Sequence, residues 1–444
     1  MRSILLILVL FYAFSVCAQN KELTFTEAVD IALQDNVMMK NARNNLRAYK
    51  ADKAFRLYSF TPNLGITSGY SRTSGPQVDA EEGFITTTTG AFRASIGSEL
   101  VLYNGNNRIN SLKSSVYRLN GQELLIKRTE QDVMNQVAMQ FLQVLLDQEL
   151  LKITEQNFLT QQRTLEEIGG FVEAGSRPEV DKYRQEADVK RFELYVIQAK
   201  NTLENDKSAL AQTLQLASSD EYVLLRPKWN IDEIRLQEYN LQELYTLALG
   251  ARADYKQLET VEKASFYDYK GAFNGYLPYL SGFISFGSTY FNANDPNQAS
   301  DNFFTQLENR RSLSYGLRLT IPIWDRLQTR NARVFNKVTY DNAVNNVENI
   351  EKSIRIEVQT AYNNFISAKA GYSVSLAQYK AAKLAYDTQQ ESYFVGLATQ
   401  VELARANDIF IQSQANLAQT GYRLLFQKVL LDYATGVLEP SGIE

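Results

Sequence analysis

The sequence predicts a membrane protein of mixed α and β class, in which strands from several copies close one β-barrel and very long helices continue it. Three observations predict this class. The chain opens with an apolar leader, its two halves resemble each other, and each half combines strand-like alternation with a long stretch that lacks proline. The helices are the unusual part, since helices of globular proteins are far shorter on average.

Residues 1–18 are predicted to form a secretory signal peptide. Arg2 precedes an apolar run, which ends at a small-residue site before Gln19. The run is shorter than the ~20 apolar residues that a membrane-spanning helix needs. A lipoprotein signal that uses Cys17 is the alternative, although Val16 fits such a signal poorly.

The composition argues against an enzyme. The 444 residues include no histidine, and Cys17 is the only cysteine, so imidazole bases, thiol nucleophiles and the usual zinc ligands are missing from the mature chain. There is no glycine-rich phosphate loop. With 46 basic and 50 acidic residues the formal charge is −4, which does not attract nucleic acid. We expect no catalytic residues, no cofactor, no metal site and no nucleic-acid partner.

Internal similarity indicates that the chain contains two copies of one unit. Residues 32–64 align without a gap with residues 248–280, at a shift of 216. Farther along, residues 171–175 face residues 392–396 at a shift of 221. Similarity at a fixed shift is the signature of an internal duplication.

The duplication predicts the domain organisation. The first repeat covers residues 19–220, the linker 221–240 and the second repeat 241–444. Each repeat is expected to contain a helix, a β-hairpin, a long helix, a tight tip and a returning helix. The hairpins are predicted at about 60–104 and 278–325.

The first repeat opens with a helix predicted to run from Thr24 or Thr26 to about Tyr58, before Pro62. The pattern then alternates with the period of two that is typical of strands. On the return strand, the apolar face is predicted to contain Phe92, Ala94, Ile96, Leu100 and Leu102. The opposite face contains Arg93, Ser95, Gly97 and Glu99.

The second repeat shows the same alternation. Its apolar positions are Leu280, Ile284, Phe286 and Tyr290 on one strand, and Leu313, Tyr315, Leu317, Leu319, Ile321 and Ile323 on the other. Arg318 lies among the polar positions of the second strand. Long polar loops are expected at about 73–89 and 292–311, as is usual at the outer end of a barrel.

We expect Arg93, Glu99 and Arg318 to line a water-filled lumen. An unpaired charge on the inner face of a soluble sandwich would cost several kcal/mol, whereas a charge in a channel meets water. The alternative is an ordinary sheet with one solvated face, which predicts the same alternation.

Four long helices are predicted, at residues 106–171, 179–216, 328–394 and 401–436. The first has no proline and spans 66 residues, or roughly 99 Å at ~1.5 Å per residue. Their apolar stripes are narrow, so each helix needs neighbouring helices, as in a coiled coil. We expect no compact core.

Four strands cannot close a barrel, because the smallest closed membrane barrels use about 8. Several chains must then contribute strands, and cyclic symmetry is the ordinary solution. Three copies would supply 3 × 4 = 12 strands.

The sequence resembles the outer-membrane efflux protein family, which comprises the TolC-like channels of tripartite efflux pumps and type I secretion systems. The resemblance covers nearly all of the mature chain and depends on four short motifs, at residues 23–28, 277–280, 321–325 and 393–397. It implies a homotrimer with a 12-stranded transmembrane β-barrel in the outer membrane, continued by a long α-helical barrel in the periplasm. It also implies a periplasmic adaptor and an inner-membrane transporter as partners.

The two predicted tips are the first candidate sites. A glycine at each tip has a structural explanation, since a left-handed glycine commonly ends a helix. The resemblance adds that the tips contact the adaptor. The residues concerned are Gly175, Ser176, Arg177, Val395, Gly396 and Leu397.

The second candidate site is a periplasmic gate. Asp181 with Arg184, and Glu402 with Arg405, repeat one charge pattern just beyond the two tips. An acid and a base at i, i+3 can also be a simple surface pair worth ~0.2–0.5 kcal/mol. The resemblance points to acidic rings at a closed periplasmic entrance, although Arg405 stands where a second acid is common.

The sequence thus predicts a passive export channel that expels small molecules or secretes proteins, with energy supplied by its partners and selectivity set by pore width and charge. A trimeric structural or adhesin-like surface stalk is the alternative. A stalk would have continuous helical zippers and strands only at its C-terminus, whereas here strands are predicted in the middle of both halves.

Overall fold

The computed structural model describes residues 21–79, 83–216, 222–227, 230–293 and 301–439. The predicted signal peptide lies outside these residues. The chain forms two compact units, each described here by itself. The helical unit consists of the described residues within Met1–Asn44, Leu124–Lys256 and Glu348–Glu444, and the sheet unit consists of those within Asn45–Glu123 and Gln257–Val347.

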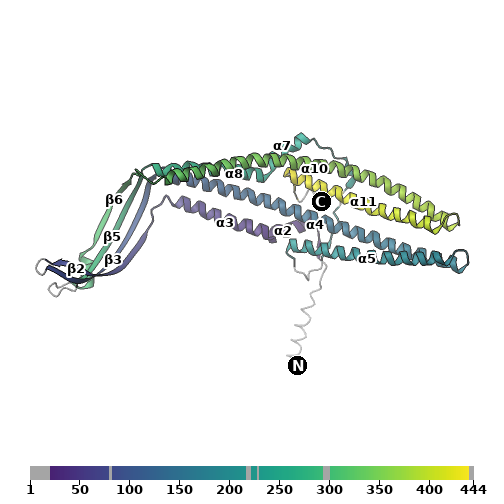
Figure 1. Cartoon of the computed structure of the whole chain (residues 1–444), viewed down its shortest axis with the longest axis horizontal. Coiled ribbons are helices and arrows are strands. Elements are labelled where there is room, and N and C mark those ends of the chain that lie inside the picture. The colour runs from purple at the N-terminus through teal and green to yellow at the C-terminus, as the bar shows by residue number, and fades with distance from the viewer. Residues whose placement is uncertain (1–20, 80–82, 217–221, 228–229, 294–300, 440–444) are drawn as a thin grey trace, which may run out of the picture. The chain divides into compact units, whose positions relative to one another are not determined.

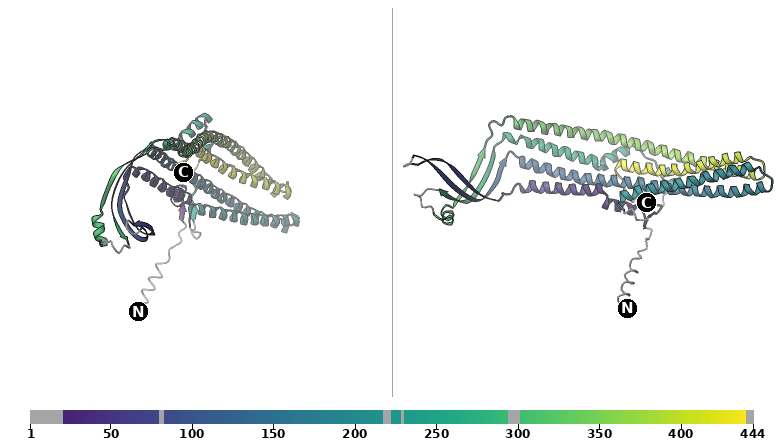
Figure 2. Two further views of the ribbon diagram at one scale, coloured as in Figure 1. Left: turned by 60° about the vertical axis from the view of Figure 1, so that its left-hand side comes forward. Right: turned by 60° about the horizontal axis from the view of Figure 1, so that its bottom comes forward.

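The sheet unit contains one four-stranded antiparallel sheet (Figure 1). Its strands are β2 (Gly65–Asp79), β3 (Gly83–Asn104), β5 (Tyr279–Ala293) and β6 (Ser312–Thr320), hydrogen-bonded in the order β2-β3-β5-β6. The sheet is curved (Figure 2). The outer edges of β2 and β6 have no partner strand within the described residues.

The strand register confirms the predicted alternation. Tyr70 lies opposite Phe92, and Phe92 lies opposite Tyr290, so the apolar positions of neighbouring strands share one face. This face is open, since Leu317 is 70% exposed and Ile66 79% exposed. The other face carries mostly polar and small side chains, with Phe283 and Phe291 among them.

The first loop prediction was wrong. Residues 73–89 are not a long loop, because β2 continues to Asp79, β3 starts at Gly83, and Thr73 pairs with Thr89. Threonine and serine fit a pleated strand well, and the hydroxyl of Thr88 donates to Ser74 Oγ at 3.0 Å. A polar strand of this kind shows no apolar alternation, so the sequence pattern did not reveal it.

The end of β6 also differs from the prediction. Ile321 and Ile323 lie beyond the strand, which ends at Thr320. Pro322 has no backbone N–H to donate to a neighbouring strand, so it ends the ladder.

A short helix, α9 (Phe303–Asn309), stands where a polar loop was predicted at 292–311. It packs at the edge of β5, where the side-chain amide of Gln306 accepts from Phe291 N at 3.1 Å and donates to Phe291 O at 3.0 Å. Pairing of β5 with β6 extends outward only to Gly287. The Gln306 amide therefore takes the place of a strand on the edge of β5.

The long helices form close to their predicted bounds. They are α4 (Asn107–Glu173), α5 (Glu179–Leu214), α10 (Gln328–Phe394) and α11 (Gln400–Thr435). The absence of proline from these stretches allows unbroken backbone hydrogen bonding. The predicted turns separate α4 from α5 and α10 from α11.

The opening helix of each repeat is broken, which the sequence did not predict. The pieces are α2 (Phe25–Asp35) and α3 (Val37–Tyr58), then α7 (Leu241–Ala251), α8 (Ala253–Gly271) and the 3-10 helix η1 (Ala272–Tyr276). Asn36 and Arg252 correspond at the shift of 216, and both are extended, with ψ 136° and 122°. Each side chain bonds to another element, Asn36 to Thr213 O at 3.2 Å and Arg252 to Ala434 O at 3.2 Å.

The helical unit has a buried core, which corrects the expectation that no compact core would form. Phe25 and Phe141 meet edge to face with ring centroids 5.5 Å apart, and both are buried. Their cluster joins α2, α4, α5 and α11. Two short strands, β1 (Lys21–Leu23) and β4 (Tyr222–Leu224), pair in parallel beside it, and α6 (Ile231–Leu236) follows β4.

None of the helices in the described ranges is both long enough and apolar enough to cross a membrane.

Candidate functional site

Each tip is a tight helix-to-helix turn with a left-handed glycine. Gly175 has φ +69° and Gly396 has φ +84°. Beyond each glycine a backbone N–H reaches back to the preceding helix, from Ser176 to Phe171 O at 2.9 Å and from Leu397 to Ser392 O at 2.8 Å. These bonds satisfy carbonyls that a helix end otherwise leaves without donors. The structural explanation for the two glycines is therefore confirmed.

The two tips contact each other within the helical unit. The guanidinium of Arg177 donates to Tyr393 O at 2.6 Å and stacks over the Tyr393 ring at 4.3 Å. Tyr393 is fully buried, whereas Val395 is 71% and Leu397 84% exposed. The exposed pair leaves an apolar surface at the second tip, and Tyr393 is a residue that sequence reasoning missed.

The candidate gate acids occupy matching helix positions but have different surroundings. Asp181 and Glu402 are each the third residue of a helix, α5 and α11. Asp181 is buried, with one carboxylate oxygen 4.0 Å from Arg184 Nη1. Arg405 is exposed and forms no ion pair among the described residues. The repeated charge pattern is therefore an ion pair in the first copy only.

Glu402 takes part in a capping box. Its carboxylate accepts from Thr399 N at 2.8 Å and from Thr399 Oγ1 at 2.9 Å. The backbone bond from Thr399, followed by the side-chain bond, lowers the pKa of Glu402 below its usual value. In the first copy Pro178 stands at the capping position and provides no side-chain bond.

A buried layer of amides joins the two helix pairs above the tips. Gln185 donates to Gln161 Oε1 at 2.8 Å and to Gln161 O at 3.1 Å, and Gln400 donates to Gln185 Oε1 at 3.2 Å. Buried polar groups hold a unique arrangement when their partners are satisfied. This layer joins the second turn of α5 to the start of α11.

The candidate lumen residues share one face of the sheet. Glu99 lies opposite Phe283, Arg93 opposite Thr289, and Arg318 opposite Ser281, all in the same alternation. Arg93 and Arg318 are exposed, and the Arg318 guanidinium lies 5.4 Å from the Phe283 ring centroid. The structure thus brings these three residues onto the polar face.

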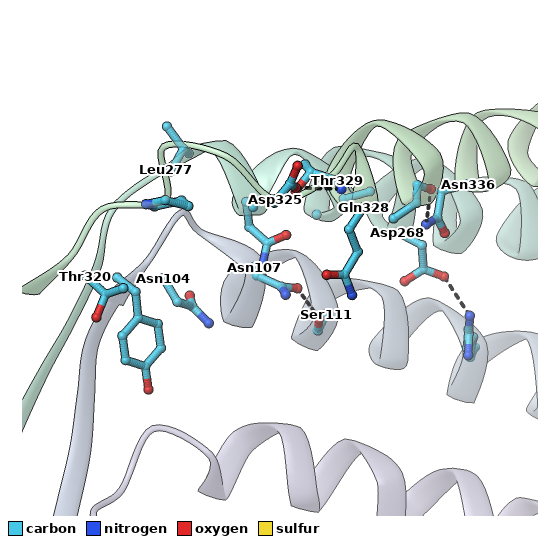
Figure 3. Close-up of a pocket in the computed structure, with 18 residues that line it drawn as sticks. Asn104, Asn107, Ser111, Asp268, Leu277, Thr320, Asp325, Gln328, Thr329 and Asn336 are labelled. Atoms are coloured by element: carbon cyan, nitrogen blue, oxygen red, sulfur yellow. Dashed lines mark hydrogen bonds and ion pairs between the residues drawn. The ribbon is translucent and has the colours of Figure 1, made fainter.

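A polar pocket of about 660 Å³ lies in the sheet unit where strands meet helices (Figure 3). Its walls come from the strand ends, α4, α8, η1 and α10. They bring together amides, hydroxyls and the ion pair of Arg118 with Asp268 at 2.6 Å. Thr320 and Tyr279 continue the alternation of Arg318 and Ser281, so the pocket continues the polar face of the sheet. Asp325 accepts from Thr329 N at 2.8 Å.

This pocket can hold water and polar solutes, because amides and hydroxyls make up much of its lining. Within the described ranges, no group of three or more histidine, cysteine or acidic side chains could hold a metal ion.

An open-edged sheet with one exposed apolar face, combined with paired helical hairpins, defines the class of outer-membrane channel subunits. The model of the outer membrane efflux protein family matches residues 28–215 and 244–437, and the chain belongs to this family. The family consists of channels rather than enzymes, in agreement with the prediction that the chain is not an enzyme. No curated protein sequence matches the chain significantly.

Solved structures show the same fold. The outer membrane protein VceC from Vibrio cholerae has a TM-score of 0.79 at 12% identity, over 93% of this chain and 96% of that chain. The CmeC outer membrane channel of Campylobacter jejuni has a TM-score of 0.79 at 16% identity, over 94% and 88%. A membrane protein from Pseudomonas aeruginosa has a TM-score of 0.78 at 17% identity, over 93% of both chains. The predicted family and the mixed α and β channel fold are confirmed.

Proposed function

We propose that three copies of this chain form the passive outer-membrane conduit of an export machine, which a periplasmic adaptor and an inner-membrane transporter complete. The machine would expel small molecules or secrete proteins. The observation that carries the proposal is the sheet β2-β3-β5-β6, which has an exposed apolar face and two unpaired edges.

The two unpaired edges of the sheet favour assembly of several copies of the chain. In a bilayer an unpaired backbone N–H or C=O costs several kcal/mol, so a sheet must close or leave the membrane. Pairing β6 of one copy with β2 of the next satisfies both edges, and three copies close a ring of 12 strands. Family membership supports this arrangement.

In this proposal the two repeats, residues 19–220 and 241–444, arise by duplication, residues 221–240 link them and the leader at 1–18 is removed. The helical barrel extends into the periplasm, where the tips contact the adaptor. The exposed apolar side chains at the second tip support this role. The proposed contact residues are Gly175, Ser176, Arg177, Val395, Gly396 and Leu397.

Arg93, Glu99 and Arg318 would line the lumen, since they occupy the polar face of the sheet. Asp181 and Glu402 would form acidic rings at the periplasmic entrance. Their position in the first turn of α5 and α11, beside the tips, supports this proposal. Arg184 and Arg405 would then bridge to acids and hold the entrance closed.

The oligomeric state tests the conduit. Native mass spectrometry of the mature protein in detergent should give a trimer, and membrane extraction should release it only with detergent. A folded monomer that keeps its strands would contradict the shared sheet, because its two edges would stay open.

Planar-bilayer recordings at low salt test the gate, since screening is weakest there. The variant Asp181→Asn plus Glu402→Gln should reduce cation preference, and Arg184→Ala plus Arg405→Ala should raise the open probability. Thermal stability of the trimer provides the control for folding. If selectivity and opening are unchanged in intact trimers, these four residues have no gating role and act only within their own helices.

A further inference from the structure

Asp147 is an acid in an unusual place. It lies on α4 and is only 5% exposed. Gln143 Nε2 donates to its Oδ1 at 3.1 Å, but none of the described residues donates to Oδ2, which is also shielded from solvent. A buried carboxylate oxygen without a donor loses its hydration and gains nothing in return. A proton or a cation bound to this oxygen would therefore stabilise the buried carboxyl group.

The nearest ionisable group is a second acid. Asp206 on α5 is close enough to Asp147 for its side chain and its negative charge to raise the pKa of Asp147. Val144 precedes Asp147 by three residues, and Leu203 and Leu210 flank Asp206 at helical spacing; all three apolar side chains belong to the main core. Two like charges close together repel, and burial of Asp147 strengthens the repulsion.

We propose that Asp147 and Asp206 form a proton-binding site, in which one proton shared between the two carboxyl groups ties the packing of α5 against α4 to the pH of the compartment. The site is separate from the tips, the sheet and the polar pocket. It is independent of whether the chain forms a conduit.

Other charged groups nearby are already paired. On α5, Lys207 bonds to Glu204 at 3.1 Å, and Lys200 lies 3.5 Å from Glu155 of α4. Glu149 of α4 pairs with Arg226 at 2.6 Å.

The short elements β4 and α2 contain no lysine or arginine. On β4 the hydroxyl of Tyr222 donates to Lys207 O at 2.5 Å, and α2, which packs on α5, pairs Asp35 with Lys40 at 2.9 Å. Within the described part of the chain, Asp206 is the charged group whose field shifts the pKa of Asp147.

A proton fits this site better than a metal ion. Calcium needs 6–8 oxygen ligands and magnesium needs six in near-ideal geometry. The two carboxyl groups and the Gln143 amide cannot supply such a set, and Gln143 presents its N–H₂ group to Asp147. A shared proton needs only two oxygens, one that carries it and one that accepts its hydrogen bond, and the two carboxyl groups provide both.

The titration falls in the physiological range. Burial, then the hydrogen bond and the negative charge of Asp206, raise the pKa of Asp147 to about 7, against the lowering effect of Gln143. Because the folded pKa is raised, the pair favours the packed state at acidic pH. This contribution decreases as pH rises from the unfolded pKa of 3.8 through about 7. Above that pH two carboxylates repel, and α5 is held less firmly.

Infrared spectroscopy of the purified protein detects the shared proton directly. The wild type should show the C=O stretch of a protonated carboxylic acid at pH 6, and the band should decrease with a midpoint near pH 7. Asp147→Asn and Asp206→Asn should each abolish this titration, since an amide can donate to the remaining carboxylate at any pH. Glu186→Gln, an exposed acid of α5, should leave the band intact.

Hydrogen exchange measures the effect on packing. After correction for intrinsic rates, protection of amides 203–210 in the wild type should fall about tenfold between pH 6 and pH 9, since pH 6 lies one unit below the pKa of about 7 and each unit is a factor of ten. Asp147→Asn should change less than about threefold over the same range. A wild type without the infrared band at pH 6, or with the same pH response as both asparagine variants, would overturn the proposal. Neither measurement depends on the oligomer mass or the conductance. A failure of the proton-site proposal can therefore be distinguished from a failure of the conduit proposal.

Discussion

Arg252 should be among the most costly single residues to replace in the helical unit. Its side chain is almost fully buried and binds three partners: Asp254 at 2.5 and 3.0 Å, Glu357 at 2.5 Å and Ala434 O at 3.2 Å. The substitution Arg252→Met keeps most of the volume and removes the charge.

The magnitude follows from what each partner loses. Glu357 is about half exposed and is hydrated again when the arginine is removed, so its lost ion pair adds little to the cost of the substitution. Ala434 O loses a donor in a buried setting, at about 1 kcal/mol. Asp254 is the main loss, since it is 20% exposed and, among the described residues, retains Tyr255 N at 2.9 Å and the Arg128 guanidinium at 3.7 Å. Breaking a buried pair costs 3–5 kcal/mol, and the retained partners reduce the total to about 3 kcal/mol.

Hydrogen exchange at residues 431–437 gives the measurement, because α11 ends there against Arg252. A loss of about 3 kcal/mol should speed exchange by about 100-fold if local opening carries the cost. Arg355→Met is the matched control, since Arg355 forms an exposed pair with Glu351 at 3.1 Å and should cost below about 0.5 kcal/mol. Equal exchange in the two variants would refute the reasoning.

Acidic pH should remove part of the stability that the ion pair of Arg252 with Asp254 contributes. Burial alone would raise the pKa of Asp254, but the hydrogen bond from Arg252 and the charges of Arg128 and Arg252 lower it below 3.8. The carboxylate therefore stabilises the fold above pH 3.8, and this contribution is lost as pH falls through the lowered pKa. Arg252→Met should weaken this acid dependence, as unfolding midpoints at pH 3 and pH 6 would show.

Two further predictions concern the sheet and the second tip. Leu317→Arg should impair membrane insertion by roughly 2–4 kcal/mol if it lies near the bilayer midplane. Gly316→Arg, on the other face of the sheet, should mainly alter conductance. Equal loss of folded oligomer in both variants would contradict the assignment of the two faces. Thr399→Ala should destabilise the first turn of α11 by about 1 kcal/mol, because it removes the cap, and exchange there should rise about fivefold. Unchanged exchange at residues 400–403 would show that the tip contacts, and not the cap, hold this turn.

Much of the fold could be predicted from local chemistry. Proline-free stretches predict the long helices, and a glycine after each predicts the turns at Gly175 and Gly396, because these features act on the backbone directly. The sheet faces followed from alternation. The breaks at Asn36 and Arg252 were missed, since the apolar pattern continues through both and the contacts that fix them come from distant segments.

The candidate site was less predictable for the same reason. Asp181 and Glu402 were found by their matched spacing, but spacing did not reveal that one is buried and the other bonded to its own helix cap. The contact of Arg177 with Tyr393 joins residues that are 216 apart in the chain. Asp147 lacks any sequence signal, because α4 is buried on most sides around it.

The Gln306 amide on the edge of β5 bears on how new chains avoid aggregation. A bare strand edge is a template on which other chains add strands in any register. By occupying the outward N–H and C=O of Phe291, Gln306 removes that template beyond the end of β6. We expect incoming copies to find only the β2 and β6 edges available, so that the chain itself excludes one route to misassembly before any partner arrives.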